Sequence, residues 1–332
     1  MGRIVIELTN RCNLSCTHCF EGRHSADGDL SIDVIETIIK NAKQYGFNHL
    51  ALTGGDATIH PEFIEIIRII SEADYEYSFV TNGQNFVKFY KKILPFSNKL
   101  NIITFSIEGA EEKTNDKIRG EGSYRRLMKA VSVCIFKDIP FTFNFVITSH
   151  NYNEIEEAIN LSRSLGARGI RFGHLMPTKL TVINDLVLST YERKRAEKKV
   201  WKLQQEYSIP IAFAIGHYTK DLFPCTPLNM QEINIDWQGN VTKCCNLSSR
   251  GGDVGDDDIV GNLSEISFEE AYAKLVDLNN KFHSFKLEHH KLKSFKDSDY
   301  FPCWYCENYH DKVGWLKRYP KNKWSDKLWT KE

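Results

Sequence analysis

The chain has 332 residues, and its 43 Lys and Arg residues balance its 43 Asp and Glu residues, so the formal net charge is zero. This balance gives no electrostatic argument for binding to nucleic acid or to an anionic membrane surface. No apolar run approaches the roughly 20 residues of a membrane span, and the first residues indicate a strand rather than a signal segment. We therefore expect a cytoplasmic protein, with enough chain for one barrel-sized domain and a smaller one.

Short β-rich runs alternate with helical patterns along the first part of the chain. The expected strands are residues 3–8, 49–53, 77–81, 100–106, 141–148 and 169–173. The expected helices are residues 31–45, 86–96, 123–137, 154–165 and 191–207, and one more that begins at Pro61. Six βα units predict a parallel sheet, and their succession favours a barrel or a partial (β/α)6 barrel over a flat sheet. Loops at the C-terminal ends of such strands carry the chemistry of barrel enzymes.

The pattern changes after about residue 210. A further strand, a hairpin, a Gly- and Asp-rich loop and two helices are expected at residues 209–215, 232–244, 250–258, 267–278 and 282–296. The tail at 312–331 mixes basic residues with aromatic ones, and we expect it to pack on the rest of the chain as a C-terminal wrap. A domain boundary near residue 215 would separate a barrel domain, residues 1–215, from a small α+β domain with the tail, residues 216–332.

The nine cysteines are unevenly distributed. Eight of them fall in three groups: Cys12, Cys16 and Cys19; Cys225, Cys244 and Cys245; and Cys303 and Cys306. Cys134 lies alone in the middle of an expected helix and is interpreted as a core residue. Since no secretory signal is evident, a disulfide framework is disfavoured, and clustering of this kind indicates metal binding.

The first group, Cys12-x3-Cys16-x2-Cys19, follows the first expected strand directly. Three thiolates can hold three corners of a cubic four-iron cluster, which leaves the fourth iron without a protein ligand. An open coordination position is typical of a reactive metal site. The alternative is a zinc knuckle in which His18 supplies the fourth ligand.

This motif, placed after the first strand of a βα barrel, resembles the radical S-adenosylmethionine (SAM) superfamily, and the resemblance covers nearly the whole chain. It implies that a [4Fe-4S] cluster binds SAM and that one electron cleaves SAM to a 5′-deoxyadenosyl radical. That radical would abstract a hydrogen atom from an unactivated C–H bond of a peptide or small-molecule substrate. The resemblance also implies a flavodoxin- or ferredoxin-type electron donor. A non-catalytic iron-sulfur or zinc-binding protein is the alternative from a different class.

Further motifs resemble the SAM-binding positions of that family. Gly54-Gly55-Asp56 resembles the Gly-Gly-Glu motif that holds the SAM amino group, with an acid one methylene shorter; the alternative is a plain strand-to-helix turn. Arg119 resembles the arginine that pairs with the SAM carboxylate; the alternative is a surface ion pair. The resemblance implies four more cofactor contacts, to methionine and ribose from Asn82 and Ser106, and near adenine from His18 and Met176.

The second and third cysteine groups resemble the SPASM/Twitch pattern of auxiliary-cluster domains. Thirteen residues separate Cys225 from Gly239 and four separate Gly239 from Cys244, while Cys303-x2-Cys306 supplies a later pair. No cysteine follows residue 306, so the resemblance is to the shorter Twitch version with one auxiliary [4Fe-4S] cluster. Its four ligands would be Cys225, Cys244, Cys303 and Cys306. A zinc site made of the same cysteines is the alternative.

Cys245 is spare in this scheme, and it faces away from Cys244 if the strand continues. A thiol close to a radical is a good hydrogen-atom donor, and the ribosomal-peptide epimerases resemble this chain in their Cys-Cys pair. The leading hypothesis is therefore Cα epimerisation of a ribosomally made peptide held between the two clusters, with Cys245 as the donor. One rival is two-electron dehydrogenation or crosslinking of a sugar, cyclitol or peptide. The structural alternative for Cys245 is a small buried residue.

Overall fold

A computed structural model describes residues 2–19, 28–248 and 255–329, and one sheet of ten strands organises it. The strands, in chain order, are β1 (Gly2–Thr9), β2 (Phe47–Gly54), β3 (Glu76–Thr81), β4 (Leu100–Ser106), β5 (Phe141–Ile147), β6 (Ile170–His174), β7 (Ile211–Phe213), β8 (Glu232–Ile235), β9 (Asn240–Thr242) and β10 (Ile259–Asn262). The α-helices are α1 (Ile32–Asn41), α2 (Phe63–Glu72), α3 (Phe86–Ile93), α4 (Glu112–Arg119), α5 (Ser123–Lys137), α6 (Ile155–Ser164), α7 (Lys179–Ile183), α8 (Thr190–Glu206), α9 (Phe268–Lys291) and α10 (Pro302–Tyr309).

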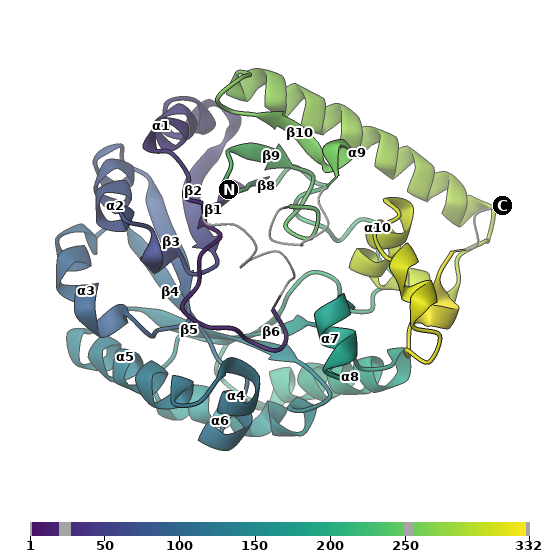
Figure 1. The fold of residues 1–332 in the computed structure, drawn as a ribbon, viewed down its shortest axis with the longest axis horizontal. Coiled ribbons are helices and arrows are strands. Elements are labelled where there is room, and N and C mark those ends of the chain that lie inside the picture. Colours follow the sequence, from purple (N-terminus) through teal and green to yellow (C-terminus); the bar gives the residue numbers. More distant parts are fainter. Residues whose placement is uncertain (1, 20–27, 249–254, 330–332) are drawn as a thin grey trace.

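The sheet is a partial barrel. Its strand order is β10-β9-β8-β1-β2-β3-β4-β5-β6-β7, and β1 to β7 all pair in parallel with their neighbours. The curved sheet carries helices such as α1, α2, α3 and α5 on its outer face (Figure 1). The two outermost strands, β7 and β10, do not pair with each other, so the barrel stays open. The six expected βα units and the partial barrel are confirmed.

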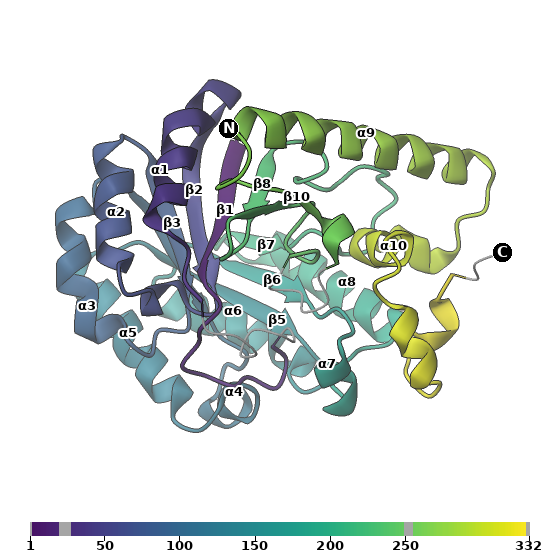
Figure 2. The ribbon, with the colours of Figure 1, turned by 45° about the horizontal axis from the view of Figure 1, so that its top comes forward.

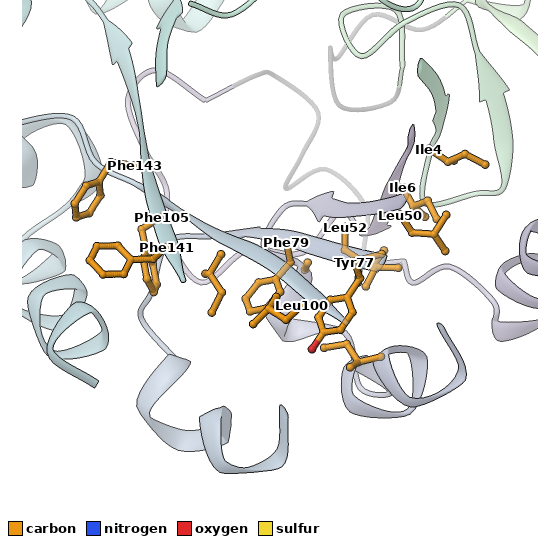
Figure 3. Close-up of a cluster of buried hydrophobic side chains, with 14 of the residues drawn as sticks. Ile4, Ile6, Leu50, Leu52, Tyr77, Phe79, Leu100, Phe105, Phe141 and Phe143 are labelled. Atoms are coloured by element: carbon orange, nitrogen blue, oxygen red, sulfur yellow. The ribbon is translucent and has the colours of Figure 1, made fainter. Parts of the chain in front are cut away.

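The two faces of the sheet differ because side chains alternate along each strand. The outward face packs a fully or almost fully buried apolar layer against the helices (Figure 3). This layer includes Ile4, Ile6, Leu50, Leu52, Tyr77, Phe79, Phe105, Phe141 and Phe143. Burying each such side chain contributes about 1.5–3 kcal/mol. The inward face is more polar, with Glu7 and Ser106 among its residues, and so a rigid apolar shell supports a polar interior.

The C-terminal strands extend the same sheet on the far side of β1. The predicted hairpin is present as β8 and β9, which pair antiparallel, and β10 pairs antiparallel with β9. β8 lies parallel to β1, with Ile4 opposite Ile233. The domain boundary expected near residue 215 falls between β7 and β8 and stays a prediction.

Some expected elements need correction. One continuous helix, α9, replaces the two helices expected at residues 267–278 and 282–296, because neither Gly nor Pro interrupts residues 268–291; it lies beside β8 and β10 (Figure 2). α4, α7 and α10 were not predicted. The loop expected at 250–258 lies partly outside the described residues, and its last three residues form a 3₁₀ turn. None of the helices in the described part of the chain is long and apolar enough to span a bilayer.

The tail packs on α8 and α10, in agreement with the expected C-terminal wrap as far as residue 329. Trp324 is 1% exposed and donates its indole N–H to the carbonyl of Leu188, at 2.7 Å. Its ring centroid lies 4.7 Å from that of Trp304 on α10. The basic residues of this tail therefore flank a packed aromatic contact.

Candidate functional site

A cavity of about 150 Å³ opens at the C-terminal ends of strands β1 to β6. It brings together predicted residues from several separate segments of the chain. They are Cys12, Cys16, His18, Cys19, Gly54, Gly55, Asn82, Ser106, Arg119 and Met176. Asp56, which was predicted together with Gly54 and Gly55, does not line the cavity. The side chains therefore meet where the parallel strands end, as expected for a barrel site.

The cysteine loop is fastened to three other elements. The backbone N–H of Thr17 donates to the carbonyl of Ile118 in α4 at 2.9 Å, and Asn184, just after α7, donates to the carbonyl of Thr17 at 3.1 Å. Asn82, just after β3, places its Nδ2 3.6 Å from the sulfur of Cys12. These contacts hold a loop without regular structure in one place above the sheet.

The glycine pair after β2 lets that loop approach the sheet closely. Gly54 has φ of 132°, and a Cβ there would lie 2.2 Å from the carbonyl oxygen of Thr9. A Cβ on Gly55 would lie 2.0 Å from the carbonyl oxygen of Arg11. Since no side chain fits in either position, this chain needs both glycines for packing as well as for any cofactor.

The carboxylate of Asp56 is buried and accepts hydrogen bonds from other groups of the protein. The side chain is 3% exposed and accepts hydrogen bonds from the backbone N–H of Asn82 at 2.8 Å and from the hydroxyl of Thr81 at 3.0 Å. The N–H and hydroxyl of Thr58 donate to it as well. Burial raises its pKa, against the effect of these four donors. The structure thus gives Asp56 partners other than the expected SAM amino group, because its shorter side chain is already saturated below the cavity.

A buried acid that the sequence analysis did not single out faces Arg119 in the cavity. Arg119 Nη1 lies 2.5 Å from Glu108 Oε2, and His18 Nε2 lies 3.5 Å from Glu108 Oε1. Burial alone would raise the pKa of Glu108, but the charges of Arg119 and His18 hold it at about 2. Arg119 is therefore in a buried ion pair rather than in a surface one. The sequence feature that could have identified Glu108 as a site residue is its position, two residues after the end of β4.

The C-terminal cysteines gather from three segments. Cys225 precedes β8, Cys244 and Cys245 follow β9, and Cys303 and Cys306 lie one turn apart on α10. Burial raises the pKa of Cys244 far above its usual value, and the neighbouring thiols of all four other cysteines raise it further. The structure thus brings together the four predicted ligands, and Cys245 with them.

The predicted orientation of Cys245 is corrected. A continuing strand would turn it away from Cys244, but β9 ends at Thr242 and a turn follows, in which the N–H of Leu247 donates to the carbonyl of Cys244. The thiol of Cys245 is among those that raise the pKa of both Cys225 and Cys303. A turn, unlike a strand, allows both adjacent thiols to face the same side.

At Gly216, the cavity residue His174 and the thiol of Cys303 come close together. Gly216 has φ of 116°, and a Cβ there would lie 2.1 Å from the ring of His174 and 2.7 Å from the sulfur of Cys303. His174 also lines the cavity. Arg193 donates to the carbonyl of Gly216 at 2.5 Å and so holds the glycine in place. His174 and Gly216 were not predicted as site residues, because their proximity to Cys303 depends on the folded position of α10.

Residues 6–162 match the family model for the Radical SAM superfamily. The chain contains a radical SAM domain. Among curated relatives, a probable GTP 3′,8-cyclase of Saccharolobus solfataricus is 29% identical over 257 residues, covering 72% of this chain and 81% of the relative. An AdoMet-dependent heme synthase of Methanosarcina barkeri is 28% identical over 248 residues, covering 73% and 70%. The names of these relatives belong to them, and what they share with this chain is the radical SAM domain.

Solved structures share its fold. Streptococcus suis SuiB bound to its precursor peptide SuiA has a TM-score of 0.64 at 15% identity, covering 80% of this chain and 63% of SuiB. The enzyme anSMEcpe with bound AdoMet and the Kp18Cys peptide has a TM-score of 0.65 at 16% identity, covering 83% of each chain. At such identities the likeness concerns the fold, a radical SAM partial barrel.

The radical SAM family implies a [4Fe-4S] cluster and SAM, and the first cysteine group fits that role. Within residues 2–19, 28–248 and 255–329, no three His, Cys, Asp or Glu side chains converge tightly enough to hold one metal ion. A four-iron cluster has a different requirement, because each cysteine binds a different iron and the thiols surround a common space. Cys12, Cys16 and Cys19 line a common cavity in this way. Burial raises the pKa of Cys16 to about 11, so its thiolate depends on a nearby positive charge such as iron.

Proposed function

We propose that this radical SAM enzyme epimerises an α-carbon in a ribosomally made peptide and that Cys245 is the hydrogen-atom donor. The observation that supports this proposal is the presence of five thiols where an auxiliary [4Fe-4S] cluster needs four. Cys225, Cys244, Cys303 and Cys306 would be the ligands. Cys245 would then lie beside the cluster without binding iron and would keep its S–H bond for hydrogen-atom transfer.

The chemistry needs one hydrogen atom removed and one returned. SAM and the first cluster, when bound, supply a 5′-deoxyadenosyl radical. That radical would take the hydrogen of the peptide Cα. The S–H bond of Cys245 then breaks and a new C–H bond forms on the opposite face of the α-carbon, which leaves a thiyl radical. One electron, from a flavodoxin- or ferredoxin-type donor, and one proton regenerate the thiol, so the peptide is neither oxidised nor reduced.

Two observations favour a peptide over a nucleoside triphosphate as the substrate. Solved structures with the same fold hold peptides, SuiA in SuiB and Cp18Cys in anSMEcpe. Of the described residues that line the cavity, Arg119 is the one Lys or Arg, and Glu108 already neutralises it. Unpaired Arg and Lys side chains are common partners of phosphate groups. GTP is nevertheless the substrate in the name of several relatives, so it belongs in the assay.

The test is turnover in D₂O. The anaerobically reconstituted enzyme is incubated with SAM, reductant and a small peptide encoded by a gene next to its own, where sequencing of the locus finds one, and in parallel with GTP. We expect 5′-deoxyadenosine and a peptide that gains one solvent deuterium at a single inverted α-carbon. A peptide without deuterium and lighter by two hydrogen atoms would contradict epimerisation. Consumption of GTP with no change in the peptide would contradict the substrate class.

A two-electron oxidation is the second candidate, and one observation favours it. A Cβ on Gly216 would clash with both the ring of the cavity residue His174 and the sulfur of Cys303, so these two groups lie close together beside that glycine. This proximity would let an auxiliary cluster accept an electron from a substrate radical, with loss of a proton to solvent. The product would then lack two hydrogen atoms through dehydrogenation or crosslinking. The D₂O experiment separates the two candidates, because oxidation incorporates no solvent hydrogen at the α-carbon.

A further inference from the structure

Helix α9 carries one lysine on its buried face. Lys286 is 4% exposed, as are Asn279 and, at 3%, Phe282 on the same helix. Asn279 and Phe282 are three positions apart, Phe282 and Lys286 four, and Asn279 and Lys286 seven. This spacing places all three along one side of an α-helix. Such a side normally carries apolar residues, because burying an ammonium group without a partner is costly. The position of Lys286 therefore calls for a nearby negative charge.

That side of α9 contacts two of the three segments that carry the auxiliary thiols. Asn279 donates to the carbonyl of Pro227 at 3.1 Å, two residues after Cys225. At the other end, the Nδ1 of His289 lies 2.9 Å from the hydroxyl of Tyr305 on α10. Tyr305 stands between Cys303 and Cys306 in the sequence. Lys286 lies between these two contacts on the helix and so faces the thiol group.

The ammonium group of Lys286 makes no salt bridge to an Asp or Glu side chain among the described residues. Its Nζ lies 4.9 Å from the ring centroid of Tyr305, and the thiols that interact with it most strongly are those of Cys306 and Cys225. Lys274 and Lys281 on the same helix are exposed and pair with acids one turn earlier. Among the described residues, Lys286 forms no such ion pair, and Asp221, an acid whose charge also acts on it, is exposed and lies outside the helices and strands.

We propose that Lys286 is the counter-cation of the auxiliary cluster and raises its reduction potential. The proposal rests on the auxiliary cluster of the proposed function. Four thiolates around a four-iron core leave a net negative charge, and one-electron reduction makes it more negative by one without forming or breaking a bond. A buried cation stabilises the reduced form more than the oxidised form, and net charge is one of the factors that set such potentials. Lys286 in turn gains the negative charge that its buried position requires.

The experiment is a potentiometric titration with dithionite, followed by electron paramagnetic resonance. It uses the full chain with Cys12, Cys16 and Cys19 replaced by Ala, so that iron bound after reconstitution belongs to the auxiliary site. In this background we expect Lys286→Met to lower the midpoint potential by at least 59 mV, a tenfold change in a one-electron equilibrium. Lys286→Arg keeps the charge and should stay near the parent value. Lys281→Met, on the exposed side of the same helix, is the matched control and should not change it.

Lys286→Gln carries the same expectation as Lys286→Met and replaces it if the methionine variant does not fold. A variant without the charge that binds its full iron and titrates at the parent potential overturns the proposed role of Lys286 alone. An equal shift in Lys281→Met overturns it as well. If the background protein binds no iron after reconstitution, the auxiliary cluster itself is absent, and the proposed function loses its basis together with the role of Lys286.

Discussion

The carboxylate of Asp56 accepts a hydrogen bond from the backbone N–H of Asn82 at 2.8 Å, which joins the end of β2 to the end of β3 beneath the cavity. Asp56→Ala would leave this buried N–H and the hydroxyl of Thr81 without their acceptor. Leaving a buried donor unpaired costs about 1–3 kcal/mol, so we expect a lower free energy of unfolding. The affinity for SAM should fall with it, because Asn82 lines the cavity. Urea denaturation and anaerobic equilibrium dialysis with SAM measure the two effects.

Asp56→Asn is the control, since it keeps one acceptor oxygen and should lose less stability than Asp56→Ala. A loss of SAM affinity without a loss of stability would have a different meaning. If either variant lost SAM affinity at unchanged stability, Asp56 would contact the cofactor directly, as its resemblance to the family motif implied.

The ion pair between Glu108 and Arg119 gives a second prediction. Glu108→Gln leaves a buried guanidinium unpaired, which costs about 3–5 kcal/mol. The SAM carboxylate would replace the missing charge, so we expect SAM to stabilise this variant more than the wild type. Thermal unfolding with and without SAM measures the difference. Equal SAM stabilisation of the two proteins would show that Arg119 does not reach the SAM carboxylate.

The pH dependence of the same variant follows from the low pKa of Glu108, about 2 in the folded protein. An acid whose pKa is depressed by folding contributes stability above its unfolded pKa, near 4.3, and loses it as the pH falls toward the folded value. Wild type and Glu108→Gln should therefore differ most in free energy of unfolding well above about pH 4.3. The difference should shrink below about pH 4, where the wild-type carboxyl becomes neutral in the unfolded chain.

Local sequence predicts most of the secondary structure, because strands and helices here obey local rules. In β5, the alternation from Phe141 to Ile147 is visible in the sequence and matches alternating burial. Ser31, the first residue of the helix expected at residues 31–45, caps α1 by accepting from the N–H of Asp33. The place of β8 was not predictable in this way. It depends on the pairing of Ile4 with Ile233, which are far apart in sequence and carry no local signal for each other.

The candidate site likewise contains some residues that local sequence predicts and others that it does not. The first cysteine group was predictable because its spacing is local and its chemistry is specific. The partner of Arg119 was not, because the role of Glu108 depends on both residues being buried in one cavity. The orientation of Cys245 depends on where β9 ends, and β9 ends at Thr242, which pairs with Ile259, the first residue of β10. Residues whose role is set by tertiary contacts thus carry no motif that would reveal them.

Cys245→Ala separates the donor role from the ligand role. If Cys245 is the hydrogen-atom donor, the variant should keep its iron content and still form 5′-deoxyadenosine. Inverted peptide should fall by at least about tenfold, about 1.4 kcal/mol in the barrier. Iron analysis, chromatography of 5′-deoxyadenosine and chiral amino acid analysis measure the three quantities.

Cys134→Ala is the matched control for Cys245→Ala, because Cys134 is fully buried in α5 and lies in the apolar core. It should lose some stability and no epimerisation. Loss of about half of the iron in Cys245→Ala would instead identify Cys245 as a cluster ligand, and unchanged yield of inverted peptide would exclude it as the donor.

Gly216→Ala tests the contact between the cavity and the auxiliary thiols. The added methyl group would lie 2.1 Å from the ring of His174 and 2.7 Å from the sulfur of Cys303. Such distances force one of them to move, and we expect Cys303 to leave its position because α10 lies outside the sheet. Bound iron should fall from about eight to about four per chain. The first cluster, measured as formation of 5′-deoxyadenosine in the absence of peptide, should persist.

Gly166→Ala separates this clash from backbone strain. Gly166 also has positive φ, at 72°, but a Cβ added there would have nothing within 4 Å of it. Ala in place of Gly166 carries a left-handed backbone cost of about 1–2 kcal/mol, and Ala in place of Gly216, whose φ of 116° lies beyond the αL region, should lose at least as much stability from strain. Iron loss in Gly216→Ala alone would place the effect at Cys303. Iron loss in both would attribute it to general destabilisation, and full iron in Gly216→Ala would show that Cys303 is not held against the glycine in the loaded enzyme.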